Sequence, residues 1–181
     1  APVLSGIETA TLTCSENVAT AITATLAISD VDNTNLTGAT IQIGTGYQSS
    51  EDVLSFANTT KITGTWTAST GTLVLSGTDT VANYQAALRT VKYQNTSGAP
   101  STVVRPVTFK VTDGATESAA VSRNIAITAV NTVATLSGIE TTSLTYAENA
   151  AATAVTATLA VTDPDNTNLT GATISIGTGY Q

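Results

Sequence analysis

The stretch Asp32-Asn-Thr-Asn-Leu-Thr-Gly-Ala-Thr-Ile41 occurs twice in this sequence, because residues 165–174 repeat it without a change. Upstream, Leu4-Ser-Gly-Ile-Glu8 returns as residues 136–140, so the second copy carries one inserted residue between the two stretches. A unit of about 130 residues has the size of one domain. The sequence therefore predicts a complete repeat at 1–131 and the first part of a second copy at 132–181.

The internal repeat also predicts that this chain belongs to an array of similar units. A third of a β-sandwich cannot bury its own apolar face, and a repeat in an array contacts chiefly its neighbours. We therefore expect the natural polypeptide to continue on both sides of this sequence, with neighbouring repeats as the first partners of each unit.

The repeat shows the two-residue periodicity of β-strands. Residues 22–28 alternate apolar side chains with threonine, and the same alternation recurs at 41–43, 73–75, 107–112 and 125–127. Gly, Asn, Asp and Ser separate these runs. Only the segment from Asp79 to Leu88 has helical spacing, and we expect it to form a short crossover helix. The prediction is an all-β fold, a Greek-key β-sandwich of the immunoglobulin-like or cadherin-like kind, in tandem.

The amino-acid composition argues against several classes of binding partner. The 181 residues carry a net charge of -7 and a pI near 4.2, which makes nucleic acid and anionic lipid poor partners. No run approaches the ~20 apolar residues of a membrane helix, so we expect no membrane insertion. The single cysteine, Cys14, has no partner within the chain and corresponds to Tyr146 in the repeat, which favours a buried apolar role.

Catalysis finds little support in the sequence. There is no histidine, so neither a Ser-His-Asp nor a Cys-His arrangement can form within this sequence. Paired carboxylates for glycoside hydrolysis remain open, but no aromatic cleft surrounds them. We therefore expect a protein that is not an enzyme.

The acidic residues instead form a repeated pattern. Asp30-Val-Asp32 recurs as Asp163-Pro-Asp165, Glu16 recurs as Glu148, and Asp113-Gly114 closes a strand. Calcium prefers such oxygen ligands. Asp and Asn are also common turn formers, so the spacing alone leaves both interpretations open.

Strand direction brings these residues together in a sandwich. Asp30, Asp32 and Asp113 are expected at the pole where the chain enters. Glu16 is expected at the opposite pole, where residues of the next unit converge on the junction. The predicted Ca²⁺ ligands are Glu16, Asp30, Asp32, Asp113, Asn131, Glu148, Asp163 and Asp165.

Four motifs resemble the calcium motifs of cadherin repeats in kind and order: Glu16-Asn17, Asp30-x-Asp32, Asp113-Gly114 and the linker Val130-Asn131. Residues 34–39, 71–77, 84–89, 93–97 and 105–114 look like the cadherin-like repeats of giant bacterial surface adhesins and RTX-type proteins. The resemblance implies an extracellular or cell-surface location and a role in attachment, matrix or biofilm. The junction departs from the usual pattern, because Val130-Asn131-Thr132-Val133-Ala134 lacks the acidic linker residue.

The sequence leaves three functions open. The first is a structural spacer repeat of a secreted bacterial adhesin, extended and stiffened by Ca²⁺. The second is a wall repeat of an extracellular filament, sheath or surface layer, in which other copies of the chain are the partners. The third is carbohydrate binding, for which Tyr47, Trp66 and Tyr180 are the aromatic candidates.

Overall fold

The computed structural model describes residues 1–179, and the chain divides between Val130 and Asn131 into two compact units. Unit 1 comprises residues 1–130 and unit 2 comprises residues 131–181. The predicted domains of 1–131 and 132–181 place this boundary one residue further along.

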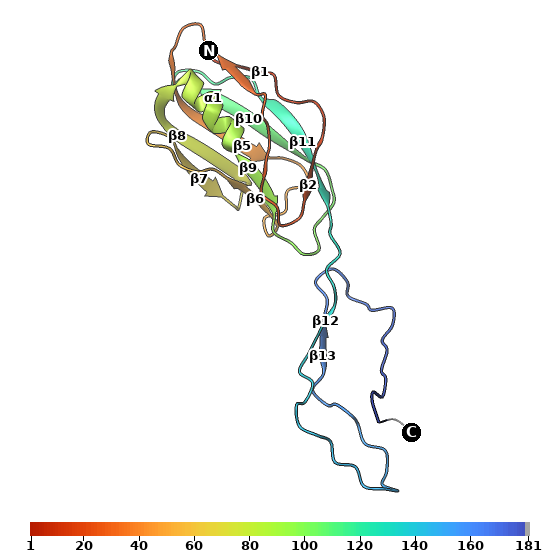
Figure 1. Cartoon of the computed structure of the whole chain (residues 1–181). Coiled ribbons are helices and arrows are strands. Elements are labelled where there is room, and N and C mark those ends of the chain that lie inside the picture. The colour runs from red at the N-terminus through yellow and green to blue at the C-terminus, as the bar shows by residue number, and fades with distance from the viewer. Residues whose placement is uncertain (180–181) are drawn as a thin grey trace. The chain divides into compact units, whose positions relative to one another are not determined.

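Unit 1 is built from strands and one helix (Figure 1). Its strands are β1 (Val3–Ser5), β2 (Leu12–Ser15), β3 (Thr20–Ala21), β4 (Ala27–Ser29), β5 (Asn35–Ile43), β6 (Asp52–Ser55), β7 (Thr63–Thr67), β8 (Thr72–Thr80), β9 (Lys92–Asn95), β10 (Arg105–Thr112) and β11 (Val121–Thr128). Helix α1 (Val81–Thr90) lies between β8 and β9.

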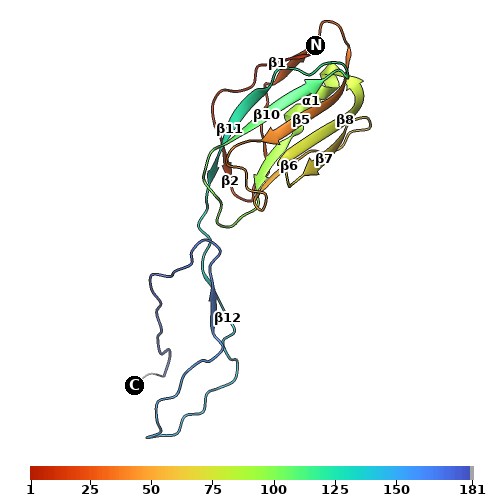
Figure 2. The same ribbon diagram turned by 180° about the vertical axis from the view of Figure 1, so that it is seen from behind.

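The strands form one large sheet and two small ones. The six-stranded sheet has the order β2-β11-β10-β5-β8-β7, a three-stranded sheet has the order β3-β9-β6, and β1 pairs with β4. All neighbours in unit 1 are antiparallel except β2 and β11, which run parallel. Figure 2 shows the large sheet from behind.

One core lies between these sheets. Phe109 of the six-stranded sheet, Tyr93 and Leu54 of the three-stranded sheet, and Leu26 belong to the same buried cluster, and none is more than 1% exposed. Alternate residues of β10 are buried, as the period-two pattern predicts. The prediction of an all-β fold with sheets around a shared core is confirmed.

The single helix follows the predicted pattern. Thr80 is its N-cap, and the Thr80 hydroxyl accepts a hydrogen bond of 3.2 Å from the backbone N–H of Asn83. Tyr84 and Leu88, one turn apart, are completely buried. The helix therefore covers the core on the side where the chain passes from β8 to β9.

Unit 2 contains a short antiparallel pair, β12 (Thr135–Ser137) and β13 (Ala160–Thr162). This pair repeats the pairing of β1 with β4, and Leu136 corresponds to Leu4. Leu4 is 7% exposed whereas Leu136 is 67% exposed. The difference arises because residues 52–128 of unit 1, which cover Leu4 and its neighbours, have no counterpart in the described part of unit 2.

Candidate metal-binding sites

Two ends of unit 1 hold the predicted ligands. The N-terminal pole is the end that carries Ala1, Asp30, Asp32, Asn33 and Asp113. The exit pole is the end that carries Glu16, which bonds to Thr128 shortly before the chain leaves unit 1.

At the N-terminal pole the structure brings two loops together. The side-chain amide of Asn33 donates a 3.0 Å hydrogen bond to Asp113 Oδ2. The backbone N–H of Asp32 donates to Asp30 Oδ1 over 3.1 Å, which closes the turn that holds both aspartates. Asp30, Asp32 and Asp113 therefore lie at one end of the unit, as strand direction predicts.

Within residues 1–179, one oxygen of the buried Asp30 carboxylate is free to accept a hydrogen bond or to bind a cation. Its side chain is completely buried, and in the described part of the chain its Oδ2 atom has no hydrogen-bond partner. The ammonium group of Ala1 lies 3.8 Å from Asp30 Oδ1 and 3.5 Å from Asp32 Oδ2. A buried, unpartnered carboxylate oxygen is costly, and a cation offsets that cost. Asp30 and Asp32 thus fit the role of ligands.

Asp113 accepts hydrogen bonds from the backbone of its own turn. Its Oδ1 atom accepts hydrogen bonds from the backbone N–H groups of Ala115 and Thr116, at 2.8 and 2.7 Å. These bonds from Thr116 and Ala115 hold the pKa of Asp113 below its ordinary value. Asp113 is therefore an ionised carboxylate that shapes its own turn, and it fits the turn-forming interpretation as well as that of a ligand.

At the exit pole, Glu16 is the residue of interest. It is 6% exposed, and its Oε2 atom is the second buried side-chain oxygen without a partner among residues 1–179. Its backbone N–H donates to Thr128 O over 3.3 Å, which fixes Glu16 beside the exit of the chain. Asn17 follows with a positive φ of 60°, a conformation that Asn tolerates.

The remaining predicted ligands belong to unit 2. Asp163 Oδ1 accepts from the backbone N–H groups of Asp165 and Asn166, both at 3.0 Å. Asp165 Oδ2 accepts from the backbone N–H of Thr132, and Asn131 Oδ1 accepts from the Asn166 side chain over 3.5 Å. The structure thus gathers Asn131, Asp163 and Asp165 within unit 2.

Calcium binding stays a prediction at every one of these residues. Glu148 is exposed, and Asn149 after it repeats the φ of 60° seen at Asn17. The expected convergence of Glu16 with residues of unit 2 concerns two separate units and stays a prediction. Among residues 1–179, no three acidic or thiol side chains form a group arranged to hold a metal ion. Any bound cation would therefore draw on amide or backbone oxygens as well.

A buried ionic network near the exit pole was missed by sequence reasoning. Arg105 Nε lies 2.7 Å from Asp52 Oδ2, and neither side chain is exposed. Tyr93 donates its hydroxyl to Asp52 Oδ1 over 2.6 Å, while Asn95 donates to Asp52 and Glu51, both over 3.1 Å. Burial, with the bond to Asp52, raises the pKa of Tyr93.

The same network holds a long loop in place. The Arg105 guanidinium donates to the carbonyl oxygens of Ser101 and Val103, at 2.9 and 2.7 Å. The backbone N–H of Ser101 donates to Glu51 over 3.0 Å. Strand parity was the available signal, because Arg105 shares the inward face of its strand with Val107 and Phe109.

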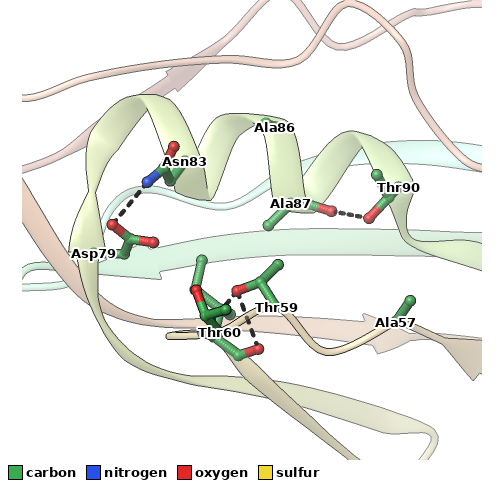
Figure 3. A pocket seen from close by; sticks show the side chains of 9 residues that line it. Ala57, Thr59, Thr60, Asp79, Asn83, Ala86, Ala87 and Thr90 are labelled. Atoms are coloured by element: carbon green, nitrogen blue, oxygen red, sulfur yellow. Dashed lines mark hydrogen bonds between the residues drawn. The ribbon is translucent and has the colours of Figure 1, made fainter.

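A groove of about 390 Å³ lies between α1 and the segment before β7 (Figure 3). Its labelled side chains are small, and Asp79 is bonded to Asn83 over 2.8 Å. That bond, with one from the Thr80 amide, keeps the pKa of Asp79 low. The groove is lined by Ala57, Thr59, Thr60, Ile62, Asp79, Asn83, Ala86, Ala87 and Thr90.

The aromatic candidates for carbohydrate binding do not form an exposed platform. Trp66 is half-buried against the core, and its ring meets that of Tyr47 edge to face at a centroid distance of 6.3 Å. The Tyr47 hydroxyl donates to Ala68 O. Tyr180 lies outside the described residues.

Comparisons with known proteins give one partial likeness. No family model matches the chain, and no solved structure matches it. Over 73 residues, or 38% of its length, the chain is 40% identical to Halomucin from Haloquadratum walsbyi (strain DSM 16790 / HBSQ001). The match covers 1% of that protein's own length. No helix within residues 1–179 is long and apolar enough to cross a membrane.

Proposed function

We propose that this chain is a structural spacer repeat of a long adhesin-type polypeptide at the cell surface or outside the cell. The observation that carries the proposal is that both copies build the same local structure. Glu8 accepts from Thr23 and from the Ala24 N–H, and Glu140 accepts from Thr156 and the Ala157 N–H, at distances of 2.7 to 2.9 Å. A unit repeated in this way extends a chain without needing a ligand of its own.

Three further observations support this role. The partial match to Halomucin lies in a very long protein, as expected for one repeat among many. The sequence has no histidine, and its clustered polar side chains form turns, buried hydrogen bonds and a buried ion pair. We therefore infer that it is not an enzyme. The shared core between sheets agrees with a Greek-key sandwich of the immunoglobulin-like or cadherin-like kind, which remains part of the proposal.

Calcium stiffening belongs to the same proposal. Asp30 and Glu16 each bury a carboxylate oxygen that lacks a partner, and they lie at the two poles of the unit. A Ca²⁺ ion at each pole would supply positive charge to these oxygens, with Asp32 as a further ligand beside Asp30. Within unit 2, Asn131, Asp163 and Asp165 are the proposed ligands, and Asp165 accepts a hydrogen bond from the backbone N–H of Thr132.

A wall repeat of a filament, sheath or surface layer is the second candidate. It is favoured by the outer face of the six-stranded sheet, on which Lys110 is the one charged residue. In that role, contacts between different chains would carry the function, in a matrix or biofilm.

Sedimentation velocity of a tandem of complete copies tests the spacer role. The frictional ratio of a spacer rises with each added copy, while the mass stays that of one chain. A frictional ratio that remains that of a compact sphere would contradict it. Filaments seen by electron microscopy in dilute solution would favour the second candidate.

A further inference from the structure

The six-stranded sheet presents an outer face in which threonine is the commonest residue, here named the threonine face. Its residues are those that alternate with the buried positions of each strand and share one side across the registered pairs. They are Thr13, Ser15, Gly38, Thr40, Gln42, Thr63, Thr65, Thr67, Thr72, Val74, Ser76, Pro106, Thr108, Lys110, Thr112, Ser122, Asn124, Ala126 and Thr128.

The strand register places these residues in rows. Thr40 lies opposite Lys110 on one side and Val74 on the other, and Val74 in turn lies opposite Thr65. Val74, the third residue of β8, is 39% exposed. Short β-branched side chains on neighbouring strands give the face an even surface.

The face is nearly free of charge, although the chain is acidic overall. Lys110 is the one charged residue among the positions named above, and its Nζ atom lies 3.3 Å from Glu117 at the border of the sheet. Carboxylates repel one another when two acidic chains approach, and charged groups are costly to desolvate. On this face, two copies can meet without repulsion between carboxylates and with little desolvation of charged groups.

An uncharged face fits itself better than it fits a charged partner. It offers no charge pattern to an oppositely charged molecule, whereas a two-fold contact places the same patch on both sides and needs only complementary shape. Sheets that meet face to face bring their side chains between one another. The partner with the matching surface is a second copy of this chain.

The size of the face sets the strength of the contact. Six strands about 4.8 Å apart and roughly 20 Å long give about 600 Å² per partner. Stable complexes bury about 800 Å² per partner, so one repeat alone associates weakly. Repeats in tandem would add their contacts through effective concentration.

We propose that the threonine face is the surface through which copies of this chain associate laterally, sheet against sheet. The proposal goes beyond the spacer role, which stands even if this face binds nothing. It predicts weak association of single chains and much stronger association of arrays.

Sedimentation equilibrium of residues 1–181 at rising concentration tests the proposal. We expect reversible association that Val74→Glu weakens at least tenfold, because two like charges then meet across the contact. Val31→Glu is the matched control, since Val31 is 98% exposed in a turn away from the face and should leave association unchanged. Mixing Val74→Glu with Val74→Lys chains should restore association.

A cross-link identifies the surface directly. In a Cys14→Ala background, Val74→Cys should form chain-to-chain disulfides under mild oxidation, while Val31→Cys should not. A parent that stays monomeric throughout would overturn the proposal. So would equal effects of Val74→Glu and Val31→Glu, or absence of the Val74→Cys cross-link, because association would then run through another surface such as the exposed apolar residues of unit 2.

Discussion

The Arg105 guanidinium lies 2.7 Å from the Asp52 carboxylate, and both side chains are fully buried. This pair joins β10 to the start of β6 and, through Ser101 and Val103, to the loop between β9 and β10. Among the ion pairs described within residues 1–179, it is the one in which both side chains are 0% exposed.

Removing one partner of this pair should destabilise unit 1 strongly. Asp52→Ala removes the nearest counter-charge of the buried Arg105 guanidinium and leaves only Glu51, 3.5 Å away, so we expect a cost of about 3 kcal/mol. Chemical denaturation of the full chain measures the change. The control is Glu117→Ala, which removes an exposed pair with Lys110 and should cost less than about 1 kcal/mol. Similar losses in the two variants would contradict the assigned role of Asp52.

Glu8 makes the stability of unit 1 depend on pH in the acid range. Burial raises its pKa, but hydrogen bonds from Thr23 and Ala24, with the charge of Arg123, lower it to about 2 from an ordinary 4.5. Because the folded pKa is the lower one, this stability is present above pH 4.5 and is lost as the pH falls towards 2. Glu8→Gln should reduce stability at pH 7 and flatten its fall between these values in denaturation curves. An unchanged pH profile would contradict this account.

The variant Asp30→Asn tests the calcium proposal, because its expected effect on thermal stability differs with and without Ca²⁺. Without calcium, Asp30→Asn removes a buried charge with an unpartnered oxygen, so the melting temperature should stay or rise. With ~10 mM Ca²⁺ and a Kd near 10⁻³ M, the parent should gain about 1.4 kcal/mol and the variant should gain nothing. Glu117→Gln, which neutralises an exposed carboxylate elsewhere, should keep the full gain. A parent that melts identically with and without Ca²⁺ would eliminate the site.

Cys14 should behave as a core residue. It is 1% exposed, and burial raises the pKa of its thiol. We expect alkylation of Cys14 only at the rate of unfolding, measured by mass spectrometry in native buffer. In a Cys14→Ala background, Tyr146→Cys at the exposed counterpart position should react at once. Rapid labelling of native Cys14 would show that it is accessible.

Much of the fold could be predicted from the sequence because it depends on local patterns. The two-residue periodicity predicted the inward residues of β10, and the helical spacing from Asp79 to Leu88 predicted α1. The repeat itself indicated that Cys14 occupies an apolar position, because Tyr146 replaces it in the copy.

The rest depends on contacts that sequence spacing does not encode. Asp52 and Arg105 are far apart in the chain, and nothing local marks them as partners. Sequence reasoning listed Asp113 as a ligand, yet its oxygens are largely occupied by its own turn and by Asn33. The unpartnered oxygens of Asp30 and Glu16 became visible only once their surroundings were known.

Small-angle scattering of a tandem of two complete copies, in dilute solution with chelator and with millimolar Ca²⁺, tests the central claim most directly. A calcium-stiffened spacer predicts a monomeric rod whose maximum dimension in Ca²⁺ is about twice that of one unit, and a broader range of shapes in chelator. Identical profiles in both conditions would contradict calcium stiffening, and a compact particle or large assemblies in both would contradict the spacer itself.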